Sequence, residues 1–262
     1  MIEGRRKPPA DGHNSVMAPL RITTYNIHKG FSQFNRRLTV HELRDRLRTL
    51  DADIVFLQEV QGEHLGHARR HLRWPALPQH EFLAEDVWHA AYGCNVEYDH
   101  GHHGNAILSR FAIATSHNQD VTHLRFERRG LLHCTLRVPG LTQPLHCVSV
   151  HLSLFGRSRK RQMEALAERL ENLVPGAAPL IVAGDFNDWR NRAHNLLAER
   201  LDMQEVFGAA RPARSFPATL PLFRLDRIYV RGFRVEGCEV HHGHHWAQLS
   251  DHAPLSARLL PA

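Results

Sequence analysis

The chain has 262 residues, 42% of them hydrophobic and 23% charged, and its formal net charge is +6 at pH 7. This composition excludes a disordered chain, a collagen-like fibre and a coiled coil, and the length suffices to bury a core without disulfides. No apolar run approaches the ~20 residues of a membrane helix. We therefore expect no transmembrane segment, and no apolar stretch follows the basic residues near the N-terminus to make a signal peptide.

Four cysteines, at positions 94, 134, 147 and 238, form no C-x-x-C motif. We therefore expect reduced thiols in a cytoplasmic protein rather than a disulfide framework or a zinc ribbon. The positive net charge favours anionic partners such as phosphates, nucleic acid or anionic lipid. The 22 histidines direct attention to metal or phosphate chemistry. The oligomeric state is open, with a monomer as the simplest expectation.

Residues 1–18 are rich in Pro, Gly and Arg and predict a flexible tail. Residues 2–5 also match a common engineered protease site, so this segment is left out of the fold reasoning. The polar and apolar alternation of 21–27 predicts a strand. A helix is predicted over 39–50, where Thr39 and Glu42 have the spacing of a capping box. The apolar run that follows, 53–57, is typical of a strand covered on both faces.

Further strands and one long helix follow in the same alternation. The helix is predicted over 158–174 and strands over 105–109, 131–138, 145–150, 180–183, 225–230 and 253–259. This order indicates one α/β domain, spanning 19–262, built on mixed sheets. Each half contains a strand, a helix and a strand that leads to an acidic residue, Glu59 or Asp185, which suggests a pseudo-symmetric pair of sheets.

Chemically competent side chains stand at the ends of the predicted strands, where ligand sites of layered α/β proteins collect. Each alone is more typical of an ordinary turn, since Gly, Asp and Asn suit turn geometry. Their joint order is informative: Tyr25-Asn26, Leu57-Gln58-Glu59, Gly104-Asn105-Ala106-Ile107-Leu108-Ser109, Val150-His151-Leu152, Gly184-Asp185-Phe186-Asn187, Leu225-Asp226-Arg227-Ile228 and Ser250-Asp251-His252-Ala253-Pro254.

This succession of motifs resembles the endonuclease/exonuclease/phosphatase superfamily, which includes DNase I-like nucleases, abasic-site endonucleases, inositol-polyphosphate 5-phosphatases and neutral sphingomyelinases. The resemblance spans about residues 20 to 260 and is strongest to the small stand-alone bacterial branch. It implies a four-layer α/β sandwich of two mixed β-sheets flanked by helices. It also implies metal-dependent cleavage of a phosphate ester.

The same resemblance assigns a role to each matched position. Glu59 is implied as the main metal ligand, Asn26 as its support, and Asp251 as a further ligand or a brace. Carboxylate and amide oxygens favour a hard cation, so Mg²⁺ is expected, with Mn²⁺ as a possible substitute. Two carboxylates that share one cation must converge, and a separation above ~10 Å between Glu59 and Asp251 would contradict this hypothesis.

The implied catalytic residues lie on the remaining motifs. Asp185 would orient or deprotonate the attacking water, and Asn187 would hold that water and a phosphoryl oxygen. His252 would lie against the phosphate, oriented by the carboxylate of Asp226. His151 would contact the phosphate or protonate the leaving oxygen. The assignment of general acid and general base stays open.

Substrate contacts are expected from several further residues. They are His103 and Asn105 in the motif around 104–109, Arg157 and Arg161 at the start of a helix whose amide groups favour anions, and Phe216 with Ser215 and Phe223 in the Pro-rich segment 211–224. For each, ordinary packing or a solvated surface is the competing interpretation. The substrate itself stays open among nucleic acid, a phospholipid headgroup and a small phosphorylated molecule.

Three alternatives remain beside a general phosphoesterase. A nuclease should offer base-stacking aromatics and a basic groove, yet aromatics make up only 8% of the chain. A non-enzymatic adaptor on the same fold should have lost some of the acids and imidazoles that are all present here. A histidine-rich metal buffer would use the runs 100–103 and 241–245 as a zinc or nickel site.

Overall fold

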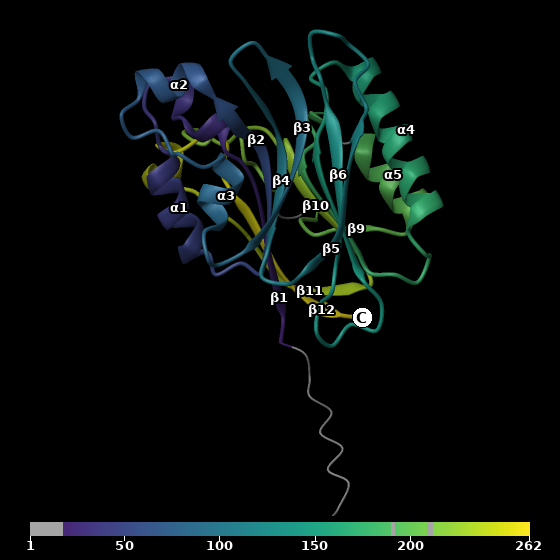
Figure 1. The fold of residues 1–262 in the computed structure, drawn as a ribbon. Coiled ribbons are helices and arrows are strands. Elements are labelled where there is room, and N and C mark those ends of the chain that lie inside the picture. The colour runs from purple at the N-terminus through teal and green to yellow at the C-terminus, as the bar shows by residue number, and fades with distance from the viewer. Residues whose placement is uncertain (1–17, 190–191, 209–211) are drawn as a thin grey trace, which may run out of the picture.

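The computed structural model describes residues 18–262 with the exception of 190–191 and 209–211, so all but the last residue of the predicted tail lies outside the described residues. The described chain contains two six-stranded sheets that pack face to face. Figure 1 shows α1, α2 and α3 on the outer side of one sheet and α4 and α5 on the outer side of the other.

The first sheet has the strand order β11-β12-β1-β2-β4-β3. Its strands are β1 (Leu20–Asn26), β2 (Ile54–His64), β3 (His89–Tyr98), β4 (Gly101–Ser109), β11 (Phe233–Val240) and β12 (Leu255–Pro261). β1 and β2 are parallel and all other pairs are antiparallel. Its helical segments are η1 (His28–Gly30), η2 (Gln33–Asn35), α1 (Val40–Thr49), α2 (Leu65–Arg70), α3 (Gln79–Ala84) and α6 (His244–Ala247).

The second sheet has the order β5-β6-β7-β8-β10-β9 and is also mixed, with β7 and β8 as its parallel pair. Its strands are β5 (Ile113–Asp120), β6 (Gly130–Leu136), β7 (Leu145–His151), β8 (Leu180–Asp185), β9 (Gln204–Glu205) and β10 (Asp226–Arg231). Its outer face carries α4 (Gly156–Leu173) and α5 (Arg192–Leu201). Each half therefore contains a parallel strand pair joined through a helix, α1 in the first half and α4 in the second.

Three apolar clusters account for the four layers. One lies between the sheets and includes Phe56, Ile107 and Ile181. The second cluster fills the space between the second sheet and α4, around Leu166 and Leu170. The third packs α1 and α3 against the first sheet. Because the first halves of β2 and β8 are covered on both faces, residues 54–57 and 180–183 are continuously apolar rather than alternating. The predicted four-layer sandwich of two mixed sheets is confirmed.

The predicted capping box at the start of α1 is wrong. The Thr39 side chain makes no capping bond; its hydroxyl instead donates to the carbonyl of Leu249, 2.9 Å away. A tertiary contact thus replaces the local one and ties α1 to the segment that leads into β12.

Four strands, β3, β5, β9 and β11, and the helix α5 were not predicted. β5 and β11 form one edge of each sheet. β5 is largely exposed and has only Ile113 and Ala114 as apolar residues, whereas the apolar alternation of β11 is interrupted by a register shift between Val235 and Gly237. β2 also continues to His64, well beyond the predicted 53–57. Within the described residues, none of the helices combines the length and apolar character needed to cross a membrane.

Candidate active site

Polar side chains converge at one end of the two sheets, where the parallel strand pairs finish. Asn26 ends β1 beside the part of β2 that leads into Glu59. In the second sheet His151 and Asp185 are directly paired at the ends of β7 and β8, and Asp226 opens β10 opposite Asp185. The packing of one sheet on the other brings these two groups together, as expected for carboxyl ends of parallel strands.

Asp185 is at the centre of the group and is almost fully buried. Its Oδ2 atom lies 3.2 Å from Nδ2 of Asn26, 3.6 Å from Nε2 of His151 and 3.8 Å from Nε2 of His252. Its Oδ1 atom accepts a hydrogen bond from the backbone N–H of Asn187 at 2.9 Å. One carboxylate oxygen therefore faces two imidazoles and one amide, while the other is held by the backbone.

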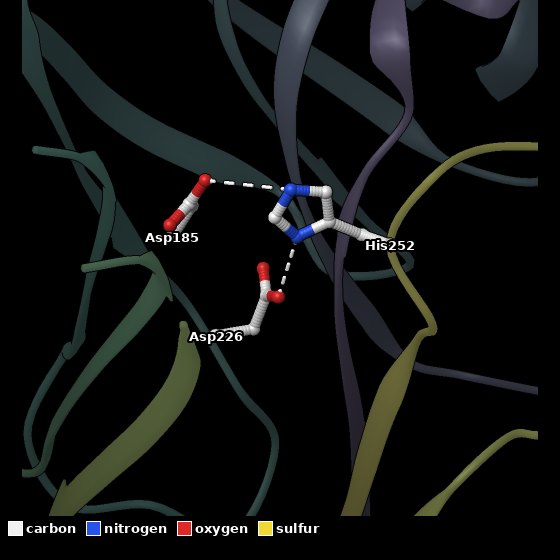
Figure 2. A group of neighbouring side chains, drawn as sticks. All are labelled: Asp185, Asp226 and His252. Carbon is white, nitrogen blue, oxygen red and sulfur yellow. Dashed lines mark hydrogen bonds and ion pairs between the residues drawn. The ribbon is translucent and has the colours of Figure 1, made fainter. Parts of the chain in front are cut away.

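The imidazole of His252 lies between Asp185 and Asp226, as Figure 2 shows. Its Nδ1 atom is 2.7 Å from Oδ2 of Asp226. The Ser215 hydroxyl donates to the same oxygen at 2.5 Å, and the Ser250 hydroxyl accepts from the backbone N–H of His252 at 3.2 Å. The ring is thus oriented by Asp226, whose carboxylate is itself held by Ser215, and Nε2 is left facing Asp185.

Burial and neighbouring charges set the protonation states of these groups. Burial opposes the charged form of His252, but the carboxylates of Asp226 and Asp185 outweigh it and raise the pKa of His252 to about 10. Burial, reinforced by the charge of Asp226, raises the pKa of Asp185 to about 7. Burial lowers the pKa of His151 well below its ordinary value. At neutral pH the site therefore holds one charged and one neutral imidazole beside a carboxyl that can accept a proton.

Two further acids flank the group on the side of the first sheet. Glu59 lies beside Asn26, with 3.5 Å between Oε1 and the amide Nδ2, and 3.9 Å from the ammonium of Lys29. Asp251 is 3.2 Å from Nδ1 of His28. This hydrogen bond raises the pKa of His28, and the charge of Glu59 acts in the same direction. Both acids therefore stabilise the charged form of His28.

Two of the functional side chains are presented by unusual backbone geometry. Glu59 has φ of +54° and Asn187 has φ of +48°, a region that non-glycine residues rarely adopt. At Glu59 the ladder between β2 and β4 shifts register between Leu57 and Val60. Such a bulge redirects a side chain that would otherwise point into a sheet face. The side-chain amide of Asn187 donates to the carbonyl of Leu152 at 2.9 Å.

The described residues contain one group of three possible metal ligands, and two partly exposed acids lie beside that group. Asp185, Asp226 and His252 have ligand atoms within 4.8 Å of one another, but the short Nδ1–Oδ2 hydrogen bond already commits His252 to Asp226. The carboxylates of Glu59 and Asp251 are partly exposed, and Glu59 has only the long contacts described above. An oxygen-rich donor set of this kind fits a hard divalent cation.

The residues predicted to contact substrate differ in how deeply they are buried. The Phe216 ring packs on His252 with 4.9 Å between centroids. His103 is partly buried beside Tyr98, and burial lowers its pKa to about 4. Asn105 is fully buried, and its amide donates to the carbonyls of Gly130 and Ser149 at 3.1 and 3.4 Å, which links β4 to the second sheet.

Among the described contacts, none joins the two predicted arginines of α4 to the catalytic group. Arg157 is exposed, and Arg161 lies 3.1 Å from the ring of His123. Arg159, which lies between them, is the arginine nearer the site: its guanidinium donates to the carbonyl of Ser153 at 2.8 Å and lies 3.9 Å from Asp188. A substrate role for the first two residues stays a prediction.

Sequence reasoning missed His28 and Lys29, which lie beside Asp251 and Glu59. Their position directly after Tyr25-Asn26 was the available signal. The histidine runs 100–103 and 241–245 contribute no residue to the single three-ligand cluster found among the described residues. Two of those histidines, His102 and His103, are in β4 rather than in a loop. Residue 211 of the Pro-rich segment lies outside the described residues.

The fold and this arrangement of acids and imidazoles define a phosphoesterase-like α/β sandwich. The model of the Endonuclease/Exonuclease/phosphatase family matches residues 23–252, and the chain belongs to that family. It is 46% identical over 242 residues, 91% of this chain and 95% of its relative, to the uncharacterized protein YbhP of Escherichia coli K12.

Solved structures share the fold at lower identity. An endonuclease/exonuclease/phosphatase from Beutenbergia cavernae has a TM-score of 0.76 at 21% identity, covering 94% of this chain and 72% of that one. The human Nocturnin catalytic domain with a bound sulfate anion has a TM-score of 0.71 at 19% identity, covering 94% and 96%. Members of the family are generally hydrolases that act on phosphate esters.

Proposed function

We propose that this chain is a divalent-metal-dependent hydrolase of phosphate esters. The observation that carries the proposal is the position of the Asp185 carboxylate, which faces the imidazoles of His151 and His252 and lies beside Asn26, next to Glu59. A base, two imidazoles and an oxygen-rich cation site on one surface are the groups that phosphate-ester hydrolysis needs. The complete set of acids and imidazoles favours an enzyme over an adaptor.

Glu59 and Asp251 would hold the cation, with Asn26 as support, because their oxygen atoms suit Mg²⁺ or Mn²⁺. When bound, the cation would neutralise negative charge that develops on the phosphoryl oxygens. The 3.5 Å contact between the amide of Asn26 and Glu59 would keep that carboxylate directed at the cation. His28 would orient Asp251 through its 3.2 Å contact.

The protein groups would then divide the proton transfer and the charge stabilisation. Asp185 would take a proton from the attacking water as the new bond to phosphorus forms, a role suited to a carboxyl whose pKa burial raises to about 7. Asn187 would hold that water and a phosphoryl oxygen. His252, kept charged by Asp226, would hold a second phosphoryl oxygen. His151 would contact the phosphate or the oxygen that leaves as its bond to phosphorus breaks.

The test is a hydrolysis panel at neutral pH with Mg²⁺, Mn²⁺ or EDTA. The substrates are bis-p-nitrophenyl phosphate, abasic and plain duplex DNA, single-stranded RNA, a lysophospholipid and an inositol phosphate. We expect activity on at least one of them, abolished by EDTA and by Asp185→Ala. Asp86→Ala, at a carboxylate whose side chain is 90% exposed, is the matched control. Activity that survives chelation would overturn the proposal.

We also propose a reducing, cytoplasmic location. The four cysteines carry free thiols, two of them buried in β6 and β7. Cys134 and Cys147 are cross-strand partners and remain unlinked, which supports a compartment that keeps thiols reduced. Localisation of a tagged protein by cell fractionation tests this proposal.

A further inference from the structure

Large apolar side chains are exposed on the loops around the proposed active site. We define the apolar rim as six of them, each between 41% and 77% exposed: Phe126, Leu154, Phe155, Trp189, Leu222 and Phe223. Single exposed hydrophobic residues need no explanation, but a cluster of them beside a reaction centre does.

The chain places the rim directly beside catalytic residues. Leu154 and Phe155 follow His151 at the end of β7, Trp189 follows Asn187 after β8, and Phe223 precedes Asp226 at the start of β10. Because β7, β8 and β10 are neighbours in the second sheet, the three loops are neighbours as well.

Ring contacts pair the exposed side chains with one another. The rings of Phe126 and Phe155 pack edge to face with 5.8 Å between centroids. Those of Trp189 and Phe223 are 4.8 Å apart, in the same edge-to-face arrangement. The rim therefore consists of grouped side chains rather than scattered ones.

Buried polar bonds hold part of the rim in its exposed position. The carboxylate of Glu127 is buried and accepts a hydrogen bond from the backbone N–H of Leu154 at 2.9 Å and another from the Ser153 hydroxyl. It also forms a 3.3 Å ion pair with Arg129. These contacts join the loop that carries Phe126 to the loop that carries Phe155. Buried hydrogen bonds therefore hold the backbone in a position that keeps both rings exposed.

Positive charge lies on the loop between β5 and β6, residues 121–129, and on the first two turns of α4. Arg125, Arg128 and Arg157 are exposed, and none forms an ion pair with a described carboxylate. Arg161 lies 3.1 Å from the ring nitrogens of His123. The rim thus combines exposed apolar side chains with guanidinium groups, the combination that inserts into the headgroup region of an anionic bilayer.

We propose that the apolar rim docks this protein on an anionic phospholipid bilayer, and that the site acts on the phosphate ester of a lipid headgroup. The inference rests on the proposed phosphoesterase function and names its substrate class. A bilayer fits better than a nucleic acid because acyl chains can bury all six rim side chains, whereas base stacking would use only the four aromatic rings and leave Leu154 and Leu222 exposed.

The experiment measures sedimentation of the whole chain with vesicles of 30% phosphatidylglycerol and 70% phosphatidylethanolamine, and with vesicles of phosphatidylcholine alone. We expect binding to the anionic vesicles only, weakened by added salt. The double variant Phe126→Ser/Phe155→Ser should lower the affinity about tenfold or more, since it removes two inserting rings. Leu173→Ser is the matched control, because Leu173 is 51% exposed at the far end of α4.

A second measurement separates this inference from the proposed function. The rim variant should cleave bis-p-nitrophenyl phosphate like the wild type but should lose most of its activity on phospholipid in vesicles. If the rim variant and the Leu173→Ser control sediment equally with anionic vesicles, or if the wild type does not sediment with them, the proposed membrane docking is overturned. The proposed phosphoesterase function would stay intact. Binding of a single-stranded oligonucleotide that the rim variant loses, without any binding to vesicles, would assign the surface to nucleic acid instead.

Discussion

The replacement Asp226→Asn tests the electrostatics of the site most directly. Oδ2 of Asp226 lies 2.7 Å from Nδ1 of His252 in a fully buried position, and the carboxylate is a principal cause of the raised pKa of this imidazole. Asparagine keeps the size of the side chain but removes its charge. A hydrogen bond to a charged group contributes ~1.5–3 kcal/mol, so the rate should fall about 10- to 150-fold if the charged imidazole acts in the transition state.

The pH dependence of stability provides an independent readout for the same variant. Because the pKa of His252 in the folded protein, about 10, lies above its ordinary value of 6.5, the folded state binds the proton more tightly. The stabilisation is therefore fully present below pH 6.5 and is lost as the pH rises through about 10. The difference in unfolding free energy between wild type and Asp226→Asn should be largest near pH 6 and should shrink toward pH 10.

Both quantities are accessible with purified protein. Initial rates on bis-p-nitrophenyl phosphate give the kinetic effect, and urea unfolding at pH 6, 8 and 10 gives the stability effect. Asp86→Asn, an exposed carboxylate, controls for the loss of one negative charge. A stability difference that stays constant across this pH range, or grows with pH, would refute the assignment of a charged His252.

Three further results are expected. Glu59→Gln should raise the Mg²⁺ concentration for half-maximal activity about tenfold or more, whereas Asp226→Asn should leave it unchanged; the reverse pattern would place the cation at Asp226. Because burial raises the pKa of Asp185 to about 7, the rate should fall as the pH drops below 7, and a rate that persists to pH 5 would contradict a carboxylate base. Leu166→Ala, at a fully buried position on the inner face of α4, should lower the free energy of unfolding in urea by ~2–5 kcal/mol. Leu173→Ala, at an exposed position of the same helix, should change it by less than ~0.5 kcal/mol.

Local sequence patterns were sufficient for most of the central strands and for the helices α1 and α4. The continuously apolar runs of β2 and β8 and the inward stripe of α4 show their burial directly in the sequence. The edge strand β5 does not, since a strand with one partner and much exposed surface needs no apolar pattern. In β11 a register shift between Val235 and Gly237 interrupts the alternation. The hydroxyl of Thr39 shows the same limit, because a carbonyl 210 residues away replaced its local cap.

The amino-acid sequence by itself predicted which residues are candidates for the chemistry, because each acid or imidazole follows or precedes a strand that its apolar residues make recognisable. Only the tertiary structure decided how they are grouped. Asp185 and Asn26 are 159 residues apart in the chain and reach 3.2 Å only when the two sheets pack on each other. The pairing of Asp251 with His28 and the exposure of the apolar rim likewise depend on how distant loops meet. Such contacts leave no local signal, since burial and charge pairing are properties of the assembled surface and not of any one segment.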